Sequence, residues 1–483
     1  MKQSLEKRDA LSYFEEYSRI PHGSGNMIAA GEFCRRFAAE NGLDFLKDSH
    51  GNVLIRKPAS RGAEGAPPVI LQGHLDMVAV QDADSSVDME CEGITLVREG
   101  DTLRADGTSL GADNGIAVGM MLSVLADSEA VHPPLEAVFT VDEEVGLLGA
   151  LTFDKACLQG KHYINLDAEG EGHFTVSCAG GATAEIRLPV CREMQKGHVF
   201  RILIDGLSGG HSGMEIGEGH ANALCLAAEL LAELSHRISY ALLAFTGGEK
   251  DNAIPTSASF ALVSADPHAK EELLLLLAAL RERLQEKEPS LITAMVEEDG
   301  EDGESPLALG EEGTRVFREL LLALPNGVRA MSREIAGLVQ TSANLAVAAL
   351  DAEAATVTVS VRSSVGKEKE DLLSEIEALV ARLGGECSVH GEYPAWEYRA
   401  HSPLRDHACA VYRRLNGKEP IVEAIHAGLE CGVFYDAIPD LDCIAFGPQM
   451  EDIHTPRERL SISSAQRTEI LLRALLAELC KGD

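Results

Sequence analysis

The chain contains 483 residues, of which 45% are hydrophobic and 25% are charged. These values are typical of a folded globular protein and exclude a disordered chain, and the length predicts two to four domains. Lysine and arginine total 42 against 77 aspartates and glutamates, a formal net charge of −35. Because nucleic acids and anionic membranes bind positive surfaces, this balance disfavours both as partners.

The N-terminal residues and the cysteines predict a cytoplasmic protein. The first 18 residues carry scattered charges and lack the apolar stretch of a secretory signal. The longest apolar run, Leu273–Leu280, is shorter than the roughly 20 residues that a membrane span requires. None of the 11 cysteines forms a CxxC pair, which disfavours a thiolate zinc ribbon, and we expect them to be buried thiols.

The first part of the chain alternates helical and strand-like patterns. Apolar spacing predicts helices over Ser4–Ile20, with Ser4 as its cap, Met27–Asn41 and Gly115–Ala126. Short apolar runs predict strands, in chain order, at Asn52–Ile55, Val69–Gln72, Ile94–Arg104, Leu135–Val141, Tyr163–Leu166 and Phe174–Ser177. This alternation favours a layered α/β fold around a central sheet.

From about Gly180 the pattern changes to alternating, half-exposed strands. Strands are predicted at Thr183–Pro189, Phe200–Asp205, Ser257–Ser264, Leu291–Glu298 and Ala355–Arg362. Helices are predicted at His220–Ser235, Pro267–Glu288, Thr314–Leu324 and Lys367–Leu383, and the acidic stretch Glu297–Ser305 is predicted to be a solvated loop. These units suit an α+β domain whose sheet has one solvated face.

After Gly384 and Gly385 the α/β pattern returns. Helices are predicted at Pro403–Leu415 and Ser463–Cys480, with a buried strand at Cys443–Phe446. We therefore expect one α/β domain in two pieces, residues 1–181 and 387–483, interrupted by an inserted domain over residues 182–386.

The segment GHLDMV follows the apolar strand predicted at Val69–Gln72. His74 and Asp76 lie two residues apart, so an extended backbone places both side chains on one face. There an imidazole can bind a metal while the carboxylate orients it. Taken alone, the pair fits a metal site and a chance surface H-x-D equally well.

Four further segments carry candidate ligands, although each has an ordinary structural explanation by itself. Asp113 in GADNG suits a turn or helix cap, and Glu143 and Glu144 in DEEVG suit a solvated acidic turn. Asp167 closes a strand, and His454 in EDIHTP suits a loop.

Considered together, the five candidate ligands favour a metal site over these separate explanations. His74, Asp113, Glu144, Asp167 and His454 are two imidazoles and three carboxylates, and most follow apolar strands, where open α/β sheets place their sites. Such a donor set suits two zinc-like ions about 3.5–4 Å apart. Two divalent cations, three carboxylates and one hydroxide come close to neutrality, which leaves Glu143 as a free carboxylate beside the metals.

With these motifs in this order, the chain resembles the M20 family of di-zinc peptidases. The segments FEEYSRIPHGSGN, TVSCAGG and HAGLECG resemble its aminoacyl-histidine dipeptidase branch, also called β-alanyl-histidine or cytosol non-specific dipeptidase. The resemblance runs essentially from end to end. It implies a two-piece catalytic domain with a mostly parallel central sheet, and an inserted lid with ferredoxin-like βαβ units.

The resemblance also implies roles for the candidate residues. His74, Asp113 and Asp167 would bind one zinc, and Asp113 would bridge to a second held by Glu144 and His454. Asp76 would orient His74, and Glu143 would be the general base for a hydroxide that bridges the two ions and attacks the peptide carbonyl. Co²⁺ and Mn²⁺ also suit these ligands.

The inserted domain supplies the remaining residues that the resemblance implies. His211 in GGHSG would stabilise the tetrahedral oxyanion, and Asn252 would hold the substrate. Arg362 would clamp the free carboxylate of a dipeptide, and Gly428 would bring backbone amides near it. The expected substrates are unblocked dipeptides, including carnosine-like Xaa-His, and a homodimer through the lid is expected.

Two other activities stay open at this point. The segment GLSGG fits the G-x-S-x-G pattern of a serine hydrolase with Ser208 as nucleophile, although the helix that should follow the serine is replaced by GGHSGMEIGEG. An M20-type enzyme that removes acyl groups from N-acyl amino acids is the nearer alternative.

Overall fold

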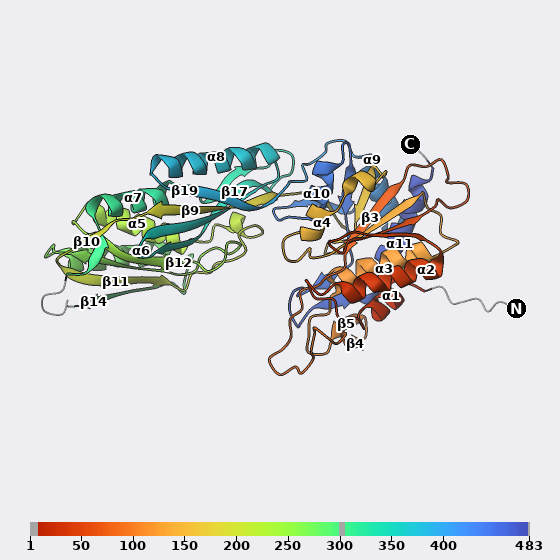
Figure 1. Cartoon of the computed structure of the whole chain (residues 1–483), viewed down its shortest axis with the longest axis horizontal. Helices are drawn as coiled ribbons and strands as arrows, with labels where there is room; N and C mark the ends of the chain where they lie inside the picture. Colours follow the sequence, from red (N-terminus) through yellow and green to blue (C-terminus); the bar gives the residue numbers. More distant parts are fainter. Residues whose placement is uncertain (1–7, 299–304, 482–483) are drawn as a thin grey trace. The chain divides into compact units, whose positions relative to one another are not determined.

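The computed structural model describes residues 8–298 and 305–481, and they form two compact units (Figure 1). The first unit combines Met1–Cys178, Trp396–Ala424 and Leu429–Asp483, and the second combines Ala179–Ala395 and Ile425–Gly428. The second boundary lies later than residue 386 because strand β19 (Glu386–Tyr393) pairs with β9 (Gly180–Pro189) of the second unit.

The first unit is built on an eight-stranded mixed sheet in the order β1-β2-β6-β3-β7-β21-β8-β20. The four central strands run parallel, and the flanking ladders of β2 with β6 and β21 with β8 are antiparallel. The strands are β1 (Asp44–Lys47), β2 (Val53–Lys57), β3 (Val69–His74), β6 (Leu135–Thr140), β7 (His162–Asn165), β8 (His173–Cys178), β20 (Ile421–Ile425) and β21 (Asp442–Ala445). The α/β fold and its parallel centre are thereby confirmed.

Helices cover both faces of this sheet. One face packs against α1 (Ala10–Tyr17), α2 (Ile28–Asn41), α3 (Ala112–Ala126), α9 (Pro403–Asn416) and α11 (Ile462–Leu479) in a single hydrophobic core. The other face carries α4 (Leu148–Thr152) and α10 (Glu430–Ala437). Side chains alternate accordingly along β7: Ile164 joins the large core, whereas the ring of Tyr163 lies 5.0 Å from that of Phe434 on α10.

Two predictions for the first part of the chain need correction. The first helix begins later than expected, since Asp9 caps it by accepting from Ser12 N–H, and Ser4 lies outside the described residues. The strand predicted over 94–104 is wrong, because the chain reverses at Gly100, where φ is +64°. It forms the hairpin β4 (Leu96–Glu99) and β5 (Thr102–Ala105), which joins β23 (Arg459–Ser461) and β22 (Met450–Glu451) in a small sheet.

The second unit is an α+β domain with a nine-stranded sheet, ordered β14-β11-β13-β12-β17-β18-β9-β19, with β16 paired to β17. The remaining strands are β11 (His198–Asp205), β12 (Ala241–Gly247), β13 (Ala258–Ser264), β14 (Ile292–Glu298), β16 (Gly327–Met331), β17 (Val339–Leu350), β18 (Ala354–Ser363), and the separate pair β10 (Arg192–Met194) and β15 (Leu307–Leu309). The sequence analysis did not predict strands β10, β12, β15, β16, β17 and β19. The ferredoxin-like description stays a prediction.

Four helices and the sheet of the second unit share one core: α5 (Ala223–Ser235), α6 (Ala269–Leu284), α7 (Glu311–Ala323) and α8 (Gly366–Arg382). Along β9, Ala184, Ile186 and Leu188 enter this core, while Glu185 and Arg187 between them are exposed. This alternation fits the predicted solvated face of the sheet.

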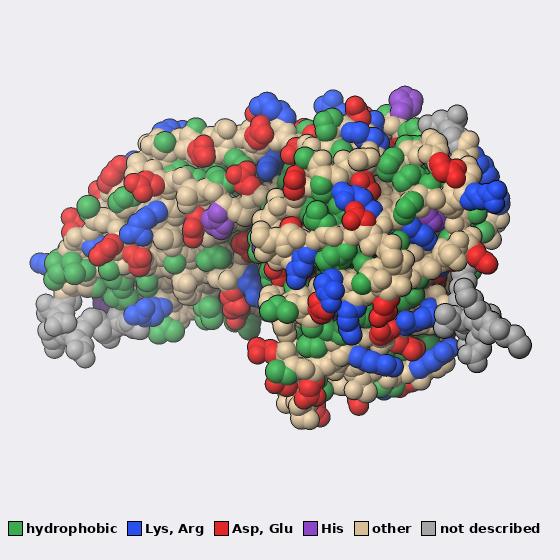
Figure 2. Space-filling view, turned by 45° about the vertical axis from the view of Figure 1, so that its right-hand side comes forward, with side chains coloured by type: hydrophobic (Ala, Val, Ile, Leu, Met, Phe, Trp, Pro, Cys, Tyr) green, Lys and Arg blue, Asp and Glu red, His purple; other side chains and the backbone are tan. Residues whose placement is uncertain are grey.

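The cysteines and the surface complete the description. All 11 cysteines are free thiols, but only four are buried and Cys91 and Cys191 are exposed, so the expectation of uniformly buried thiols was wrong. On the face in Figure 2, acidic and basic side chains lie interspersed with hydrophobic ones. Among the described residues, no helix is long and apolar enough to cross a bilayer.

Candidate metal centre

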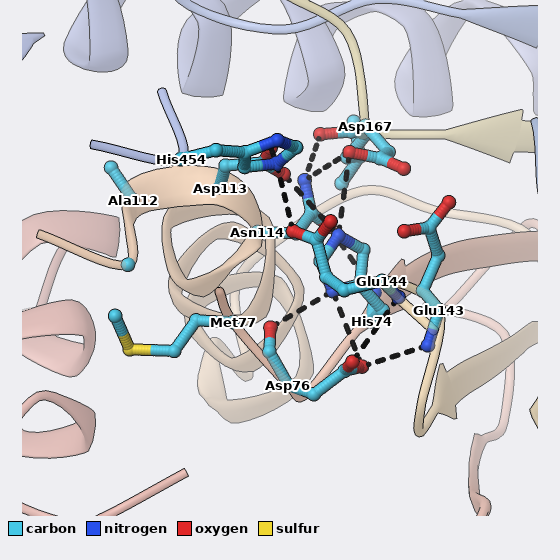
Figure 3. A network of polar contacts seen from close by, with 12 residues as sticks. His74, Asp76, Met77, Ala112, Asp113, Asn114, Glu143, Glu144, Asp167 and His454 are labelled. Carbon is cyan, nitrogen blue, oxygen red and sulfur yellow. Dashed lines mark hydrogen bonds and ion pairs between the residues drawn. The ribbon is translucent and has the colours of Figure 1, made fainter. Parts of the chain in front are cut away.

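The candidate ligands of the first unit converge at the carboxyl edge of the parallel strands. Strand β3 is buried along its whole length and ends at His74. Strands β6 and β7 flank it in parallel, and Glu144 and Asp167 follow their last residues. Because parallel strands end at the same sheet edge, these side chains meet there, as Figure 3 shows.

Asp113 reaches the same edge from the start of α3. Residues 112–125 of this helix are all buried, as expected for a helix that is apolar on every side. Asp113 and Asn114 have non-helical dihedral angles, so the regular helix begins at Gly115, the predicted start. Asn114 Nδ2 donates to Asp167 Oδ1 at 3.1 Å, which holds that carboxylate beside the helix start.

His454 enters from the loop between β22 and β23. Its backbone is left-handed, with φ of +59°, a conformation that costs free energy for a residue other than glycine and that clusters at functional sites. The side chain is 44% exposed, which makes it the most accessible of the five candidate ligands.

The distances place Asp113 between the two histidines. His74 Nε2 lies 3.2 Å from Asp113 Oδ1, and His454 Nε2 lies 3.1 Å from Asp113 Oδ2. His74 Nε2 is also 3.6 Å from Asp167 Oδ1, and His454 Nε2 is 3.0 Å from Glu144 Oε1. Each oxygen of Asp113 therefore faces a different histidine, the arrangement that a bridging carboxylate requires.

Two groups of three side chains offer ligand atoms within 4.8 Å of one another: His74, Asp113 and Asp167, and Asp113, Glu144 and His454. They share Asp113, as the predicted ligand sets do. A third such group joins His74 with Glu143 and Glu144. Imidazole nitrogens and carboxylate oxygens are suitable ligands for zinc and for related divalent ions.

Asp76 connects the two sides of this centre. Its Oδ1 lies 3.4 Å from His74 Nδ1 and accepts from Glu143 N–H at 3.1 Å. Its Oδ2 accepts from Glu144 N–H at 3.3 Å and from Ser24 Oγ at 2.8 Å. One buried carboxylate thus orients the His74 ring and fixes the backbone of the following acidic pair.

The electrostatics show a concentration of negative charge that cations would relieve. Burial alone would lower the pKa of both histidines, but the facing carboxylates raise the pKa of His74 well above its usual range and that of His454 to about 11. Burial raises the pKa of Asp167 to about 6, with a further increase from Asp113. Carboxylates crowded in this way are stabilised by positive charge.

Glu143 belongs to neither of the two ligand groups that share Asp113, so its carboxylate remains available beside them. Burial raises its pKa well above the usual range, and the negative charges of Asp167, Glu430 and Glu144 add to this effect. A carboxyl group with a raised pKa beside a metal centre is typical of a general acid or base.

The other four predicted residues belong to the second unit. His211 Nδ1 accepts from the backbone N–H groups of Gly213 and Met214 at 3.2 and 3.1 Å, which leaves the proton of a neutral ring on Nε2. Ser212 N–H donates to the backbone oxygen of Asn252 at 2.8 Å. This bond, together with an isolated bridge between His211 and Ala253, ties the loops of His211 and Asn252 together.

Arg362 and Gly428 are linked through Tyr393. Arg362 Nη1 donates to Tyr393 Oη at 2.8 Å, while its buried Nε has no hydrogen-bond partner. A Cβ atom at position 428 would lie 2.6 Å from Tyr393 Cε2. Gly428 is therefore required for this close packing, a reason that the sequence interpretation did not contain.

Ser208 does not have the surroundings of a hydrolase nucleophile. Its Oγ donates to Glu288 Oε2 at 2.8 Å, and no α-helix begins in the chain between it and α5 at Ala223. A nucleophile elbow requires a strand, the serine and then a helix directly.

Sequence reasoning missed two buried glutamates near the ligands. Glu458 accepts hydrogen bonds from four consecutive backbone N–H groups, those of residues 110–113, at 2.8–3.2 Å. Glu430 is fully buried in contact with the ends of β3 and β6. The HTPRE and GLECG segments contained the only signal, an acidic residue two to four positions after a predicted site residue.

A cavity of about 1030 Å³ adjoins the centre within the first unit. Glu144 contributes to its wall, and Met77, Val87 and Met89 give it apolar surface. Asp88 and Glu90 add negative charge. The volume is in the range of sites that hold a small organic ligand.

A bipartite α/β fold with histidines and carboxylates gathered at the sheet edge defines a metallopeptidase-like protein. The chain belongs to the peptidase family M20/M25/M40, whose model matches residues 70–478.

Within that family, the chain is 35% identical over 472 residues to the cytosol non-specific dipeptidase of Escherichia coli (strain K12), with 96% of each chain covered. It is similar to the crystal structure of aminoacylhistidine dipeptidase from Vibrio alginolyticus, with a TM-score of 0.89, 31% identity and coverage of 99% of this chain and 97% of that one. The aminopeptidase PepT from Bacillus cereus shares the fold, with a TM-score of 0.56 and 14% identity. The predicted family is thereby confirmed.

Proposed function

We propose that this protein is a metal-dependent dipeptidase that hydrolyses unblocked dipeptides, including Xaa-His substrates. The observation that carries the proposal is the position of Asp113, with one carboxylate oxygen beside each of His74 and His454. The dipeptidases from Escherichia coli and Vibrio alginolyticus, which match this chain over nearly its whole length, give the substrate class.

The donor set fits a pair of divalent cations. His74, Asp113 and Asp167 would hold one ion, and Asp113, Glu144 and His454 the other, most suitably Zn²⁺, with Co²⁺ or Mn²⁺ as alternatives. Bound there, the cations would lower the pKa of a water molecule and polarise the substrate carbonyl.

The protein's own residues would then move the proton and hold the substrate. Glu143 would take a proton from the attacking water and return it to the leaving amine. The Nε2–H of His211 is free to donate to the oxyanion, and Arg362, with its unpaired Nε, supports binding of the terminal carboxylate. Asn252 and Gly428 would complete the contacts with the substrate.

The remaining expectations also belong to the proposal. We propose a cytoplasmic enzyme, in keeping with the relative that is named for the cytosol, and a homodimer formed through the second unit. Nucleic acids and membranes are not expected partners at a net charge of −35.

The decisive experiment combines metal analysis with a substrate panel. Purified protein should contain or take up two divalent ions per chain and hydrolyse carnosine, Ala-His and Leu-Gly. Chelation should abolish this activity, and Zn²⁺ or Co²⁺ should restore it.

N-acetyl amino acids in the same panel separate the dipeptidase from its nearest alternative. Cleavage of these substrates in preference to the dipeptides would contradict the proposal, as would hydrolysis that survives full removal of metal. The variant Ser208→Ala is the control. It should retain activity because the Ser208 hydroxyl donates to Glu288, which is no part of the candidate metal centre, and the backbone N–H keeps its own bond to Glu288.

A further inference from the structure

Glu430 is a buried acid that the proposed reaction does not use. It begins α10, its side chain is fully buried, and its Oε1 has no hydrogen-bond partner. Its Oε2 accepts from Thr140 Oγ1 at 2.7 Å and from Gln72 Nε2. Thr140 is the last residue of β6, and Gln72 lies two residues before the end of β3.

The hydrogen bonds continue from Gln72 to β7. Gln72 Nε2 also donates to Thr140 Oγ1 at 3.0 Å, and Gln72 Oε1 accepts from Tyr163 Oη at 2.8 Å and from Asn165 Nδ2 at 2.6 Å. Asn165 Oδ1 in turn accepts from the backbone N–H of Asp167 at 3.1 Å. The four side chains that join Glu430 in this network are fully buried.

The network therefore links the ends of three parallel strands behind the candidate ligands. Each strand supplies a ligand within a few residues of the network: His74 ends β3, Glu144 follows β6, and Asp167 follows β7. In this network Asn165 donates to Gln72. Gln72 and Thr140 in turn donate to Glu430 Oε2, which is the final acceptor. Loss of that acceptor would leave two buried donors, an amide N–H of Gln72 and the hydroxyl of Thr140, without this hydrogen-bond partner.

Stability alone does not explain an acid at this position. Burial raises the pKa of Glu430 to about 8, so the folded state disfavours its ionised form and its burial costs free energy near neutral pH. A glutamine at this position would keep an acceptor oxygen for both donors and would avoid this cost.

We propose that Glu430 is a positioning residue: it fastens the ends of β3, β6 and β7 together and thereby sets the spacing of His74, Glu144 and Asp167 for two cations. The inference rests on the proposed function, because it concerns the same metal centre. Residues that orient metal ligands from behind typically change metal affinity or activity by about 10- to 100-fold when replaced.

The test is a titration of metal-free, full-length protein with Co²⁺ alone, followed by visible absorbance and equilibrium dialysis. Glu430→Ala should weaken the affinity for at least one of two Co²⁺ ions by about 10- to 100-fold. Glu430→Gln should recover most of this loss, since its amide oxygen can accept the same two hydrogen bonds. Thr140→Val, which removes one of the donors, should lie between wild type and Glu430→Ala.

Glu136 offers a matched control on the same strand. It is also a buried glutamate, near the opposite end of β6, and its Oε2 accepts from two backbone N–H groups, both at 2.9 Å. Glu136→Ala should lower thermal stability but leave Co²⁺ affinity at the wild-type value.

The outcomes separate this inference from the proposed function. If wild-type protein binds no pair of Co²⁺ ions, the proposed function fails. If wild type binds two ions and Glu430→Ala binds them equally tightly, only the positioning role fails. Equal losses of affinity in Glu430→Ala and Glu136→Ala would also overturn it, because they would show a general effect of destabilisation. If Glu430→Ala does not fold, an unchanged affinity in Thr140→Val overturns the inference.

Discussion

The carboxylate of Asp76 and the backbone of Glu143 are joined by a hydrogen bond of 3.1 Å, from Glu143 N–H to Asp76 Oδ1. The same oxygen lies 3.4 Å from His74 Nδ1. A residue at the end of β3 thus fixes both a candidate metal ligand and the candidate base that follows β6. Replacing Asp76 should therefore reduce activity and metal affinity more than the loss of its contact with His74 alone would.

Replacement of Asp76 by asparagine should lower kcat/KM by about 10- to 100-fold and reduce metal affinity. The amide keeps one acceptor oxygen but places an NH2 group against either the acidic loop or Ser24. Ser24→Ala is the control, because it removes the 2.8 Å bond to Asp76 Oδ2 and a long 3.4 Å bond to Met77 O but leaves the Asp76 carboxylate in place. Steady-state kinetics with metal analysis will test this, and equal effects of the two variants would contradict it.

Replacement of Glu143 by glutamine should leave both metals bound and lower kcat by about 10²- to 10⁴-fold, the usual contribution of a general base. Asp142→Asn is the matched control in the same acidic run. Asp142 has φ of +55°, which asparagine tolerates, so turnover should change little. Hydrolysis by Glu143→Gln at the wild-type rate would reject the assigned base.

Glu458 should stabilise the fold through the start of α3. Its carboxylate accepts from four backbone N–H groups, including that of Asp113 at 3.2 Å. Glu458→Ala should lower the free energy of unfolding by about 3 kcal/mol, since a typical intramolecular hydrogen bond contributes about 0.5–1.5 kcal/mol and water will replace part of the four. It should also weaken metal binding.

Glu451→Gln is the control for Glu458. This exposed glutamate pairs with Arg459 at 2.7 Å, and surface pairs contribute about 0–1 kcal/mol. Chemical unfolding of the metal-free variants measures both values. A stability loss in Glu458→Ala no larger than that in Glu451→Gln would show that the backbone contacts are unimportant.

Arg362→Lys should raise KM for dipeptides by about tenfold or more with little change in kcat, because lysine cannot form the paired contact of a guanidinium with a carboxylate. Dipeptide amides, which lack that carboxylate, should be hydrolysed equally by wild type and variant. Tyr393→Phe removes only the hydroxyl that accepts from Arg362 and should have a smaller effect. An equal loss on acids and amides would contradict the clamp.

Acid should destabilise the metal-free protein partly through His22. Burial lowers the pKa of His22 to about 4, whereas an unfolded chain has a histidine pKa near 6.5. Between these values the unfolded state binds more protons, so the stability contributed by neutral His22 is lost as the pH falls from 6.5 through 4. The loss should approach about 1.4 kcal/mol per pH unit.

The check is urea unfolding of wild type and His22→Asn between pH 4.5 and 7. The variant should show a shallower dependence on pH, while His401→Asn, at an exposed position, should follow wild type. Parallel curves for wild type and His22→Asn would rule out this contribution.

Apolar strands with polar ends were the features that sequence analysis located best. Strands β3 and β6 are buried throughout, so their continuous apolar runs are distinctive. Strand β17 escaped prediction because its sequence, VQTSANLAVAAL, contains alanine and small polar residues, and its burial comes from pairing with β18 and β12. Weak local preference was overcome there by tertiary packing.

The sequence by itself determined the type of chemistry: histidines and carboxylates in a fixed order, placed where apolar strands end, and a family resemblance that the comparisons bore out. Only the tertiary structure decided that Asp113 faces both histidines and that Glu458 and Glu430 lie behind the ligands. The contact of Glu458 with Asp113 joins residues 345 positions apart in the sequence, and that of Glu430 with Gln72 joins residues 358 positions apart. They depend on where backbone N–H groups and strand ends come to lie, which no local pattern of side chains specifies.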